Sequence, residues 1–504
     1  MNANTALLAL FALPLLASPV IYLVGRITVK LTRKHTAGWP ARALTVAVLL
    51  AALAPLYYAA QSFSINGPYE LHLHQIALRL DGISLLMSFV AIVLGLVVAL
   101  FSSRYMSGEE NEEKFYALLA ALVGALFGMG CAVDLFNLWV WFEAMSITSV
   151  MLVAFYKNQP AALEASIKYL VQSAVGSVFI LFGISLVYAF TGALNLSAIQ
   201  ANLSQPSPLL MVAAALFVIG FGVKAALVPL HTWLPDAHSQ APSGISAMLS
   251  GIVIEAALLA LLRTLSSLTD ASVSPGVILL VFGALNILVG NLMALRQTQV
   301  KRLLAYSSVA HMGYILLGFG FSLAYGSLNG AQGAFFHILN HAAMKGLAFL
   351  SVGAVMYVLL IANHNHRALE VEDLNGLSQR YPLLAFTLSL AVLALGGMPP
   401  LAGFMSKWQI FVAGAQASSP AILALVVFAG LNSVLSLGYY APLINRMYRR
   451  QPADVIAAGK PLTFSLALSL VLLSLPVVIL GFWPSLAAPL TEPAARALLA
   501  AFGL

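Results

Sequence analysis

Apolar runs of about twenty residues recur from Thr5 to Phe482, separated by short polar connections. A run of this length spans a bilayer as a helix, and the runs lack the period-two alternation of a membrane β-barrel. The pattern therefore predicts an all-α integral membrane protein with about 14 transmembrane helices in a single domain, residues 1–504. The expected helices lie near residues 5–26, 41–60, 83–102, 115–133, 135–156, 165–190, 209–230, 243–264, 274–295, 303–321, 331–361, 383–417, 420–442 and 462–482.

The basic residues are distributed unevenly over the connections. Odd-numbered loops hold 18 of the 24 Lys and Arg residues, whereas the even-numbered loops and the tail hold only Arg79, Arg263 and Arg496. The positive-inside rule then places the odd loops in the cytoplasm and both termini on the opposite side. The first run lacks a basic leader and a small-residue cleavage site, so we expect a retained helix rather than a signal peptide.

Composition narrows the chemistry that the chain can carry. It is 61% hydrophobic and only 8% charged, and its net charge of +7 is spread over loops rather than along one nucleic-acid-binding face. The single cysteine, Cys131, supplies neither an internal disulfide nor the four thiolates of an iron–sulfur cluster. No spacing resembles a zinc site or a phosphate-binding loop. We expect no metal or cofactor in this chain.

Five ionisable residues lie inside the apolar runs: Glu143, Lys224, Glu255, Lys345 and Lys407. Each such group at mid-bilayer costs about 2.5–3.5 kcal/mol or more, so it needs pairing, water or a function. Lys224 carries a charge opposite to that of Glu143 and is therefore its expected partner. The pair is either part of a proton path or a static ion pair that ties two helices together.

His337, His341 and Lys345 are four residues apart and share one face of a helix, while His311 belongs to the preceding helix. Titratable groups in line suit proton hopping, although a membrane histidine is also a common hydrogen-bonding contact between helices. Lys407 is expected to end the line.

Prolines interrupt two of the expected helices. The first interruption, from Pro229 to Pro242, carries His231, Asp236 and His238, which are either an access path or capping residues. The second is Gly396-Gly397-Met398-Pro399-Pro400. Broken helices at matching places in two halves are typical of inverted-repeat transporters.

Four motifs carry a resemblance to a known family: Trp-Phe-Glu143, Pro229-Leu-His-Thr-Trp-Leu-Pro-Asp-Ala-His-Ser-Gln-Ala-Pro242, Lys301-Arg-Leu-Leu-Ala-Tyr-Ser-Ser-Val-Ala-His311, and Gly-Met-Pro-Pro-Leu-Ala-Gly-Phe before Lys407. Over nearly its whole length the chain resembles the antiporter-like subunits of respiratory complex I, Mrp cation/proton antiporters and membrane-bound hydrogenases.

The resemblance implies two inverted five-helix repeats with broken helices seven and twelve. Residues 1–110 would hold helices one to three, 111–265 the first half, 266–445 the second half and 446–504 helix fourteen and the tail. It also implies a Glu143–Lys224 pair, a relay through His311, His341 and Lys345, and an end of the path at Lys407.

One position departs from the family pattern. Where a lysine is usual on helix eight, this chain has Glu255 in Ser250-Gly-Ile-Val-Ile-Glu255. We expect this carboxylate to act on Lys224 and keep it charged. The relay then runs with altered energetics, or the subunit is partly inactive.

The resemblance implies a proton-translocating subunit, of M or N type, in a complex I-type NADH:quinone oxidoreductase of an energy-transducing membrane. Partner subunits would carry FMN, iron–sulfur clusters and quinone, since this chain holds no redox centre. The alternatives are an Mrp-type Na+/H+ antiporter subunit of the D type, a membrane-bound hydrogenase subunit, or a scaffold that transports no protons.

Overall fold

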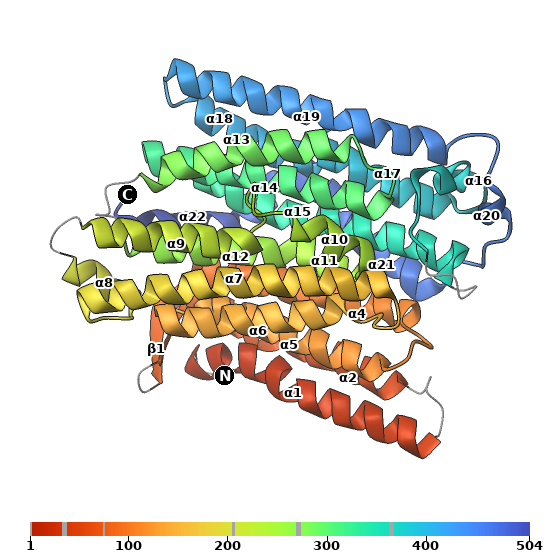
Figure 1. Cartoon of the computed structure of the whole chain (residues 1–504), viewed down its shortest axis with the longest axis horizontal. Helices are drawn as coiled ribbons and strands as arrows, with labels where there is room; N and C mark the ends of the chain where they lie inside the picture. The colour runs from red at the N-terminus through yellow and green to blue at the C-terminus, as the bar shows by residue number, and fades with distance from the viewer. Residues whose placement is uncertain (1–2, 33–37, 74–75, 204–206, 269–273, 362–366) are drawn as a thin grey trace.

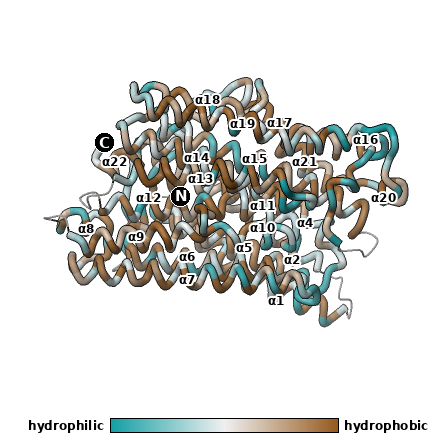
Figure 2. The backbone as a smooth tube through the Cα atoms, turned by 45° about the horizontal axis from the view of Figure 1, so that its top comes forward, coloured by the Kyte–Doolittle hydropathy of each residue, from teal (hydrophilic) through white to brown (hydrophobic). Residues whose placement is uncertain are grey.

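The computed structural model describes residues 3–32, 38–73, 76–203, 207–268, 274–361 and 367–504. Long helices lie side by side along one direction and form a single bundle (Figure 1). The helices are hydrophobic along most of their length, and hydrophilic residues gather near one end of the bundle, around α16 and α20 (Figure 2). This distribution fits a body whose middle lies in hydrocarbon.

Twelve described helical segments are long and apolar enough to cross a membrane, and two shorter apolar helices, α9 and α17, accompany them. The segments are α1 (Ala3–Thr32), α2 (Trp39–Ala51) continued by α3 (Leu53–Asn66), α4 (Gly82–Tyr105), α5 (Glu112–Cys131), α6 (Leu135–Val153), α7 (Pro160–Thr191), α9 (Pro208–Lys224), α11 (Ser243–Met248) continued through the π-helical turn η1 (Leu249–Val253) into α12 (Ile254–Ser266), α13 (Pro275–Ala294), α14 (Val300–Tyr325), α15 (Leu328–Leu359), α17 (Pro382–Gly396), α19 (Pro420–Met447) and α21 (Phe464–Phe482).

Shorter elements complete the chain. They are β1 (Tyr69–Leu73), β2 (Ile76–Leu80), α8 (Leu196–Asn202), α10 (Trp233–Gln240), η3 (Val371–Leu374), α16 (Leu377–Arg380), α18 (Ala402–Ala415), α20 (Asp454–Ala457), η4 (Pro484–Ala487) and α22 (Ala488–Ala501). The predicted all-α membrane fold is confirmed, and each expected helix overlaps one of these segments, although the expected helix 383–417 is divided into α17 and α18. The inverted relation between the two halves stays a prediction.

Polar residues fix where several helices begin. The Asp81 carboxylate accepts the Ser84 amide at 2.8 Å, and the Ser84 hydroxyl accepts the Asp81 amide at 2.8 Å, which is a capping box at the start of α4. The Asp134 carboxylate similarly accepts the Asn137 amide at 2.7 Å at the start of α6. These caps satisfy backbone donors that the bilayer would leave unpaired.

The helices divide into an enclosed centre and a lipid-facing periphery. The most apolar windows of α14 and α15 are 100% and 94% buried, whereas those of α1 and α19 are 22% and 28% buried. The centre carries His311 on α14 and His341 and Lys345 on α15. Their ionisable groups are therefore surrounded by protein rather than by lipid.

Both proline-rich interruptions are real breaks. The expected helix 209–230 stops at Lys224, and α10 begins only at Trp233. The expected helix 383–417 is two helices, because α17 ends at Gly396 and Gly397 adopts a φ of 81°, a left-handed conformation that suits glycine.

Two elements outside the bilayer-length runs were not predicted. β1 and β2 form an antiparallel hairpin in which Tyr69 faces Leu80, and Arg79 pairs with Glu70 across the strands. The tail folds as α22 and packs against α4 and α15. Both segments are too short to span a membrane, so a search for apolar runs passes over them.

Candidate functional site

The first break places a buried lysine at the end of a half-helix. Lys224 is the last residue of α9 and is 0% exposed. Its ammonium donates to the Ser149 hydroxyl at 3.3 Å and lies 4.1 Å from the centre of the Tyr169 ring. The carbonyl end of a helix carries partial negative charge, and an aromatic face attracts a cation. Both features stabilise a positive charge at Lys224.

The ring of Tyr169 is itself held in place. It stacks on Trp233 with ring centres 4.0 Å apart and an angle of 4°. The Trp233 indole donates at 2.6 Å to the Val223 carbonyl in the last turn of α9, which also accepts the Ala226 amide at 3.3 Å. The first residue of α10 thus positions the aromatic ring that faces Lys224.

Asn286 on α13 closes the backbone of the same break. Its carbonyl oxygen accepts the Val228 amide at 2.9 Å, and its amide donates to the Ala226 carbonyl at 3.0 Å. One side chain therefore replaces two hydrogen bonds that a continuous helix would have made. Asn286, Ser149 and Tyr169 do not stand out in the sequence, because small polar and aromatic residues are common in membrane helices.

Glu143 lies on α6 but does not meet Lys224 directly. One of its carboxylate oxygens is buried and has no hydrogen-bond partner among the described residues. No ion pair joins it to Lys224 in the described part of the chain, where the lysine contacts Ser149 instead. The expected closed pair is therefore open, although Glu143 still acts on Lys224 by Coulombic attraction. A static ion pair between the two helices is not formed, and the hydrogen bond from Lys224 to Ser149 joins α9 to α6 instead.

At the centre of the bundle Glu255 pairs with a histidine. The distance from its Oε1 to Nδ1 of His341 is 2.5 Å, and both side chains are 0% exposed. The π-helical turn η1 ends two residues before Glu255 and re-aims the side chains that follow it. The hydrogen-bonding partner of Glu255 is thus His341 on α15, and the expectation that Glu255 keeps Lys224 charged stays a prediction.

Two further imidazoles continue from this pair. The rings of His341 and His337 stack with centres 6.1 Å apart, as their four-residue spacing predicts. His311 stacks on His341 with centres 5.1 Å apart, and its Nδ1 lies 3.0 Å from Nε2 of His337. Nδ1 of His337 lies 2.8 Å from the Ser406 hydroxyl, which leads to the second break.

The second break holds Lys407 much as the first holds Lys224. The Lys407 ammonium donates to the Leu395 carbonyl at 2.9 Å and to the Ser433 hydroxyl at 2.9 Å. It also lies 4.5 Å from the centre of the Tyr314 ring. A half-helix carbonyl end, a hydroxyl and an aromatic face again surround a buried ammonium.

Lys345 joins this cluster from the side. It is four residues after His341 on α15, and its ammonium donates to the Ser307 hydroxyl at 2.6 Å and to the Leu304 carbonyl at 2.7 Å. The Ser307 hydroxyl in turn bonds the Tyr440 hydroxyl. Lys345 is thereby fixed between α14 and α15.

The sequence-predicted residues thus separate into two groups. Glu255, His341, His311, His337 and Ser406 form one buried track, called the central track, in which every link is a hydrogen-bond contact except the ring stack between His341 and His311, and Lys407 directly follows Ser406 in α18. Glu143 and Lys224 form a second group at the first break, and no direct side-chain bond between the two groups is found over the described residues.

The candidate access residues have different surroundings. Asp236 bridges Arg302 at 2.5 Å and Lys168 at 3.2 Å, which ties α10 to α14 and α7. His231 lies edge-on to Tyr306, with ring centres 6.2 Å apart. His238 is fully buried, stacks on Phe349 at 4.7 Å, and has no partner on either ring nitrogen among the described residues. Asp236 is a clamp between helices, whereas the two histidines keep free ring nitrogens.

No group of three His, Cys, Asp or Glu side chains suited to a metal ion is found in the described part of the chain. Proton-exchanging groups are what the site offers: carboxylates, imidazoles, ammoniums and hydroxyls at hydrogen-bond distance. Each of them donates or accepts protons, so together they can pass a proton over several steps.

Comparisons with known proteins agree with this geometry. Residues 132–433 match the family described as NADH:quinone oxidoreductase/Mrp antiporter, TM, and residues 71–116 match NADH-Ubiquinone oxidoreductase (complex I), chain 5 N-terminus. F(420)H(2) dehydrogenase subunit N of Methanosarcina mazei is 33% identical over 428 residues, covering 83% of this chain and 84% of the relative. NADH-quinone oxidoreductase subunit N of Desulfitobacterium hafniense is 30% identical over 477 residues, covering 90% and 92%.

A solved structure extends the similarity over the full length. A chain of the membrane-bound sulfane sulfur reductase, an archaeal respiratory membrane complex, superposes with a TM-score of 0.86 at 29% identity, covering 99% of each chain. The family match spans more than half of the chain, and curated relatives exceed 30% identity over most of it. The chain therefore belongs to the antiporter-like membrane subunits of the NADH:quinone oxidoreductase/Mrp family.

Proposed function

We propose that this chain is the proton-translocating, subunit N-type membrane subunit of a complex I-type NADH:quinone oxidoreductase. Its curated relatives are subunits N of NADH-quinone oxidoreductase and of F(420)H(2) dehydrogenase. The redox reaction belongs to partner subunits, which would carry FMN, iron–sulfur clusters and quinone. The part played by this chain is to move protons through the bilayer along buried side chains.

The central track is the observation that carries this proposal. From Glu255 to the Ser406 hydroxyl beside Lys407, its polar contacts are 2.5, 3.0 and 2.8 Å long, with the His311–His341 stack between the first and the second. A buried imidazole accepts a proton on one ring nitrogen and releases one from the other, so a row of imidazoles conducts protons. A structural role alone does not require so many titratable groups in the most enclosed helices.

Lys224 and Glu143 supply a controllable step beside this track. Lys224 is held by dipoles and an aromatic ring rather than by a closed ion pair. Movement of Glu143 toward or away from the ammonium changes the free energy of the charged lysine through Coulomb's law. Redox-driven movements in partner subunits would act on this distance, and His231, Asp236 and His238 lie on the proposed access side.

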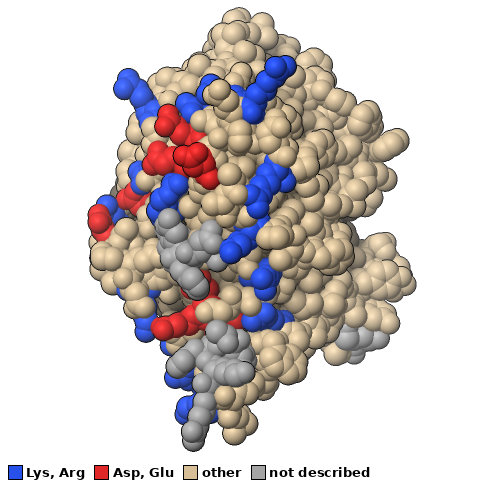
Figure 3. Space-filling model, turned by 90° about the vertical axis from the view of Figure 1, so that its right-hand side faces the viewer, with Lys and Arg blue, Asp and Glu red and all other residues tan. Residues whose placement is uncertain are grey.

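The charge distribution supports the orientation expected from the sequence. Figure 3 views the end of the bundle that carries α16 and α20, and Lys, Arg, Asp and Glu side chains gather on it. Under the positive-inside rule this end, which contains the odd loops, faces the cytoplasm. Both termini then lie on the opposite side of the energy-transducing membrane.

Reconstitution of the purified complex into proteoliposomes tests the function. Lys224→Ala and Glu143→Ala should each lower the number of protons moved per electron pair while the electron transfer of the partner subunits continues. Lys157→Ala, at an exposed loop position, is the matched control and should leave the ratio unchanged. Unchanged proton transport in both site variants would establish the scaffold instead.

A second assembly is favoured by one observation. The full-length superposition at TM-score 0.86 is with a chain of the sulfane sulfur reductase complex. The same proton path can serve a different redox module, because this chain contacts protons rather than the electron donor. Purification of the complex with identification of every subunit by mass distinguishes an NADH-oxidising module from a sulfur-reducing one, and from an Mrp assembly without redox subunits.

A further inference from the structure

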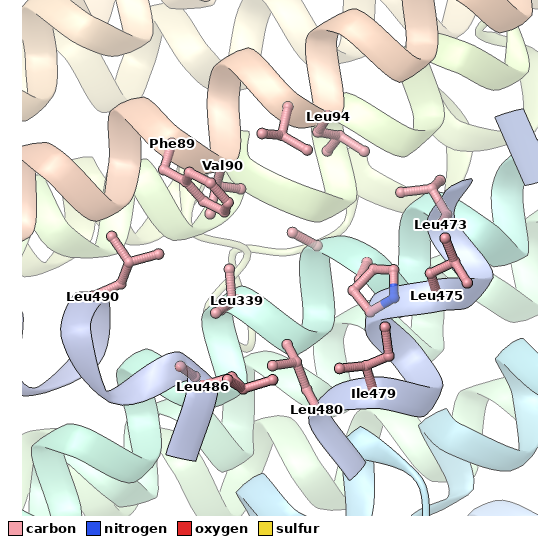
Figure 4. Close-up of a pocket in the computed structure, with 15 residues that line it drawn as sticks. Phe89, Val90, Leu94, Leu339, Leu473, Leu475, Ile479, Leu480, Leu486 and Leu490 are labelled. Carbon is pink, nitrogen blue, oxygen red and sulfur yellow. The ribbon is translucent and has the colours of Figure 1, made fainter. Parts of the chain in front are cut away.

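An apolar pocket lies directly behind the central track. It has a volume of about 320 Å³, is open on one side, and is bounded by α4, α15, α21 and α22. Figure 4 shows Leu94, Leu339, Leu473 and Leu490 around it, each from a different helix. Every lining side chain is apolar. Neither the proton path nor the family motifs involve this pocket.

The pocket is suited to one class of occupant. Water needs two to four polar partners to stay in a cavity, and this lining provides none. Three of the four bounding helices are candidate membrane spans, so acyl chains of the bilayer are the apolar groups available at this opening. A flexible aliphatic chain satisfies both conditions.

Only the thickness of α15 separates the pocket from the central track. Ala342 and Ala343 line the pocket and directly follow His341 in the helix. Gly346 follows Lys345, and a Cβ there would lie 2.9 Å from Leu94 and 3.1 Å from Leu473, two other lining residues. Small residues thus keep the wall behind His341 and Lys345 thin.

We propose that this pocket binds one acyl chain of a membrane phospholipid, and that the bound chain completes the hydrocarbon barrier behind His341 and Lys345. Leu94 and Leu473 hold α15 on one side, and the acyl chain fills the space beside Ala342 and Ala343. With this space filled, the wall behind the relay is continuous hydrocarbon. Protons in the central track then have no route to the lipid-facing side.

Cryo-electron microscopy of the complex in nanodiscs tests the occupant. The discs are prepared with phosphatidylcholine whose acyl chains carry bromine, and the map is compared with that from unbrominated lipid. Excess scattering inside the pocket is expected for the native chain. Ala343→Phe, which fills the pocket with its own ring, should abolish it. Ala424→Phe, at an exposed alanine of α19 remote from the lining, should keep it.

The outcomes of this measurement are distinct. Absence of bromine scattering in the native chain, or a partner side chain seated in the pocket, would overturn the proposal. So would bromine scattering that persists in Ala343→Phe. Val93→Phe fills the same space from α4 and takes the place of Ala343→Phe in this test if that variant does not assemble.

A second arm tests the barrier and rests on the proposed function. Detergent delipidation should lower the proton-to-electron ratio of the native complex at least twofold, and added phospholipid should restore it. Ala343→Phe should keep its ratio through delipidation, because the ring supplies the missing hydrocarbon. If delipidation lowers the proton-to-electron ratio equally in the native and variant complexes, the bound chain is not a barrier to protons. Whether the chain binds in the pocket is still decided by the bromine scattering. A native complex that moves no protons even when lipidated would instead refute the proposed function.

Discussion

Glu255 and His341 meet across the contact between the eighth and eleventh membrane segments, with 2.5 Å between the carboxylate oxygen Oε1 and the imidazole nitrogen Nδ1. The second carboxylate oxygen and the second ring nitrogen have no partner among the described residues. The pair therefore has one closed hydrogen bond and two free positions. A carboxylate with a free oxygen beside an imidazole with a free nitrogen can take a proton on one side and release it on the other.

Replacement of Glu255 by glutamine should separate geometry from proton transfer. Gln has nearly the same shape and still contacts His341, but it does not exchange a proton at neutral pH. We expect proton transport by the reconstituted complex to fall about 100-fold, the usual contribution of a positioned acid or base. The measurement is the rate of acidification of proteoliposomes at fixed electron-transfer rate.

Two further changes at the same position complete that test. Glu255→Asp keeps an ionisable carboxyl and should retain measurable transport, whereas Glu255→Lys restores the charge usual on this helix. If transport in Glu255→Gln equals that of the native complex, the carboxyl is a structural partner of His341 and takes no part in the path. Full transport by Glu255→Lys would mean that the path does not require the negative charge of Glu255.

The ring that faces Lys224 should matter more than its hydroxyl. Tyr169→Phe keeps the aromatic face 4.1 Å from the ammonium and loses only the 2.9 Å bond to Ser149. Tyr169→Leu loses the face as well, which removes about 2 kcal/mol of cation–π attraction in a desolvated site. Proton transport should therefore be close to native in the first variant and reduced severalfold in the second. Equal transport in both would assign the stabilisation of Lys224 to the end of α9.

The sequence identified the charged members of this site for a clear physical reason. An ionisable side chain in an apolar run is costly, so Lys224, Lys345 and Lys407 stand out wherever the chain is expected to be helical. The four-residue spacing of His337 and His341 also fixed their common face. Spacing says which residues share a face but not which neighbouring helix that face meets. The hydrogen bond between Glu255 and His341 was therefore not predicted.

Small polar residues gave no comparable signal. Asn286, Ser406 and Ser433 resemble the many other polar residues of membrane helices, and their roles depend on partners on other segments. These partners are backbone groups at the breaks for Asn286 and Ser433, and the His337 imidazole for Ser406. The β-hairpin was missed for a related reason, since a five-residue strand is too short to register among runs of about twenty. The prolines predicted where the helices break but not what fills the gaps.

Asn286 therefore offers a test of how the first break is stabilised. Asn286→Ala leaves the Val228 amide and the Ala226 carbonyl without their partner in a buried site. Each unsatisfied backbone group costs about 1–3 kcal/mol, so the thermal unfolding midpoint of the complex should fall by several degrees. Asn66→Ala, at an exposed position, is the control and should not shift the midpoint. A midpoint unchanged in Asn286→Ala would mean that other groups satisfy the break.

Arg263 forms a buried ion pair away from the proton path. Its guanidinium donates to both carboxylate oxygens of Asp81, at 2.8 and 2.9 Å, and to the Gly130 carbonyl at 2.9 Å, and both charged side chains are 6% exposed. Arg263→Met strands a buried carboxylate and should destabilise the fold by about 3–5 kcal/mol, measured by thermal unfolding in detergent. Adding Asp81→Asn removes the stranded charge and keeps a cap for α4, so the double variant should regain much of the loss. If the double variant is no more stable than the single one, the bond to Gly130 rather than the ion pair holds α12 in place.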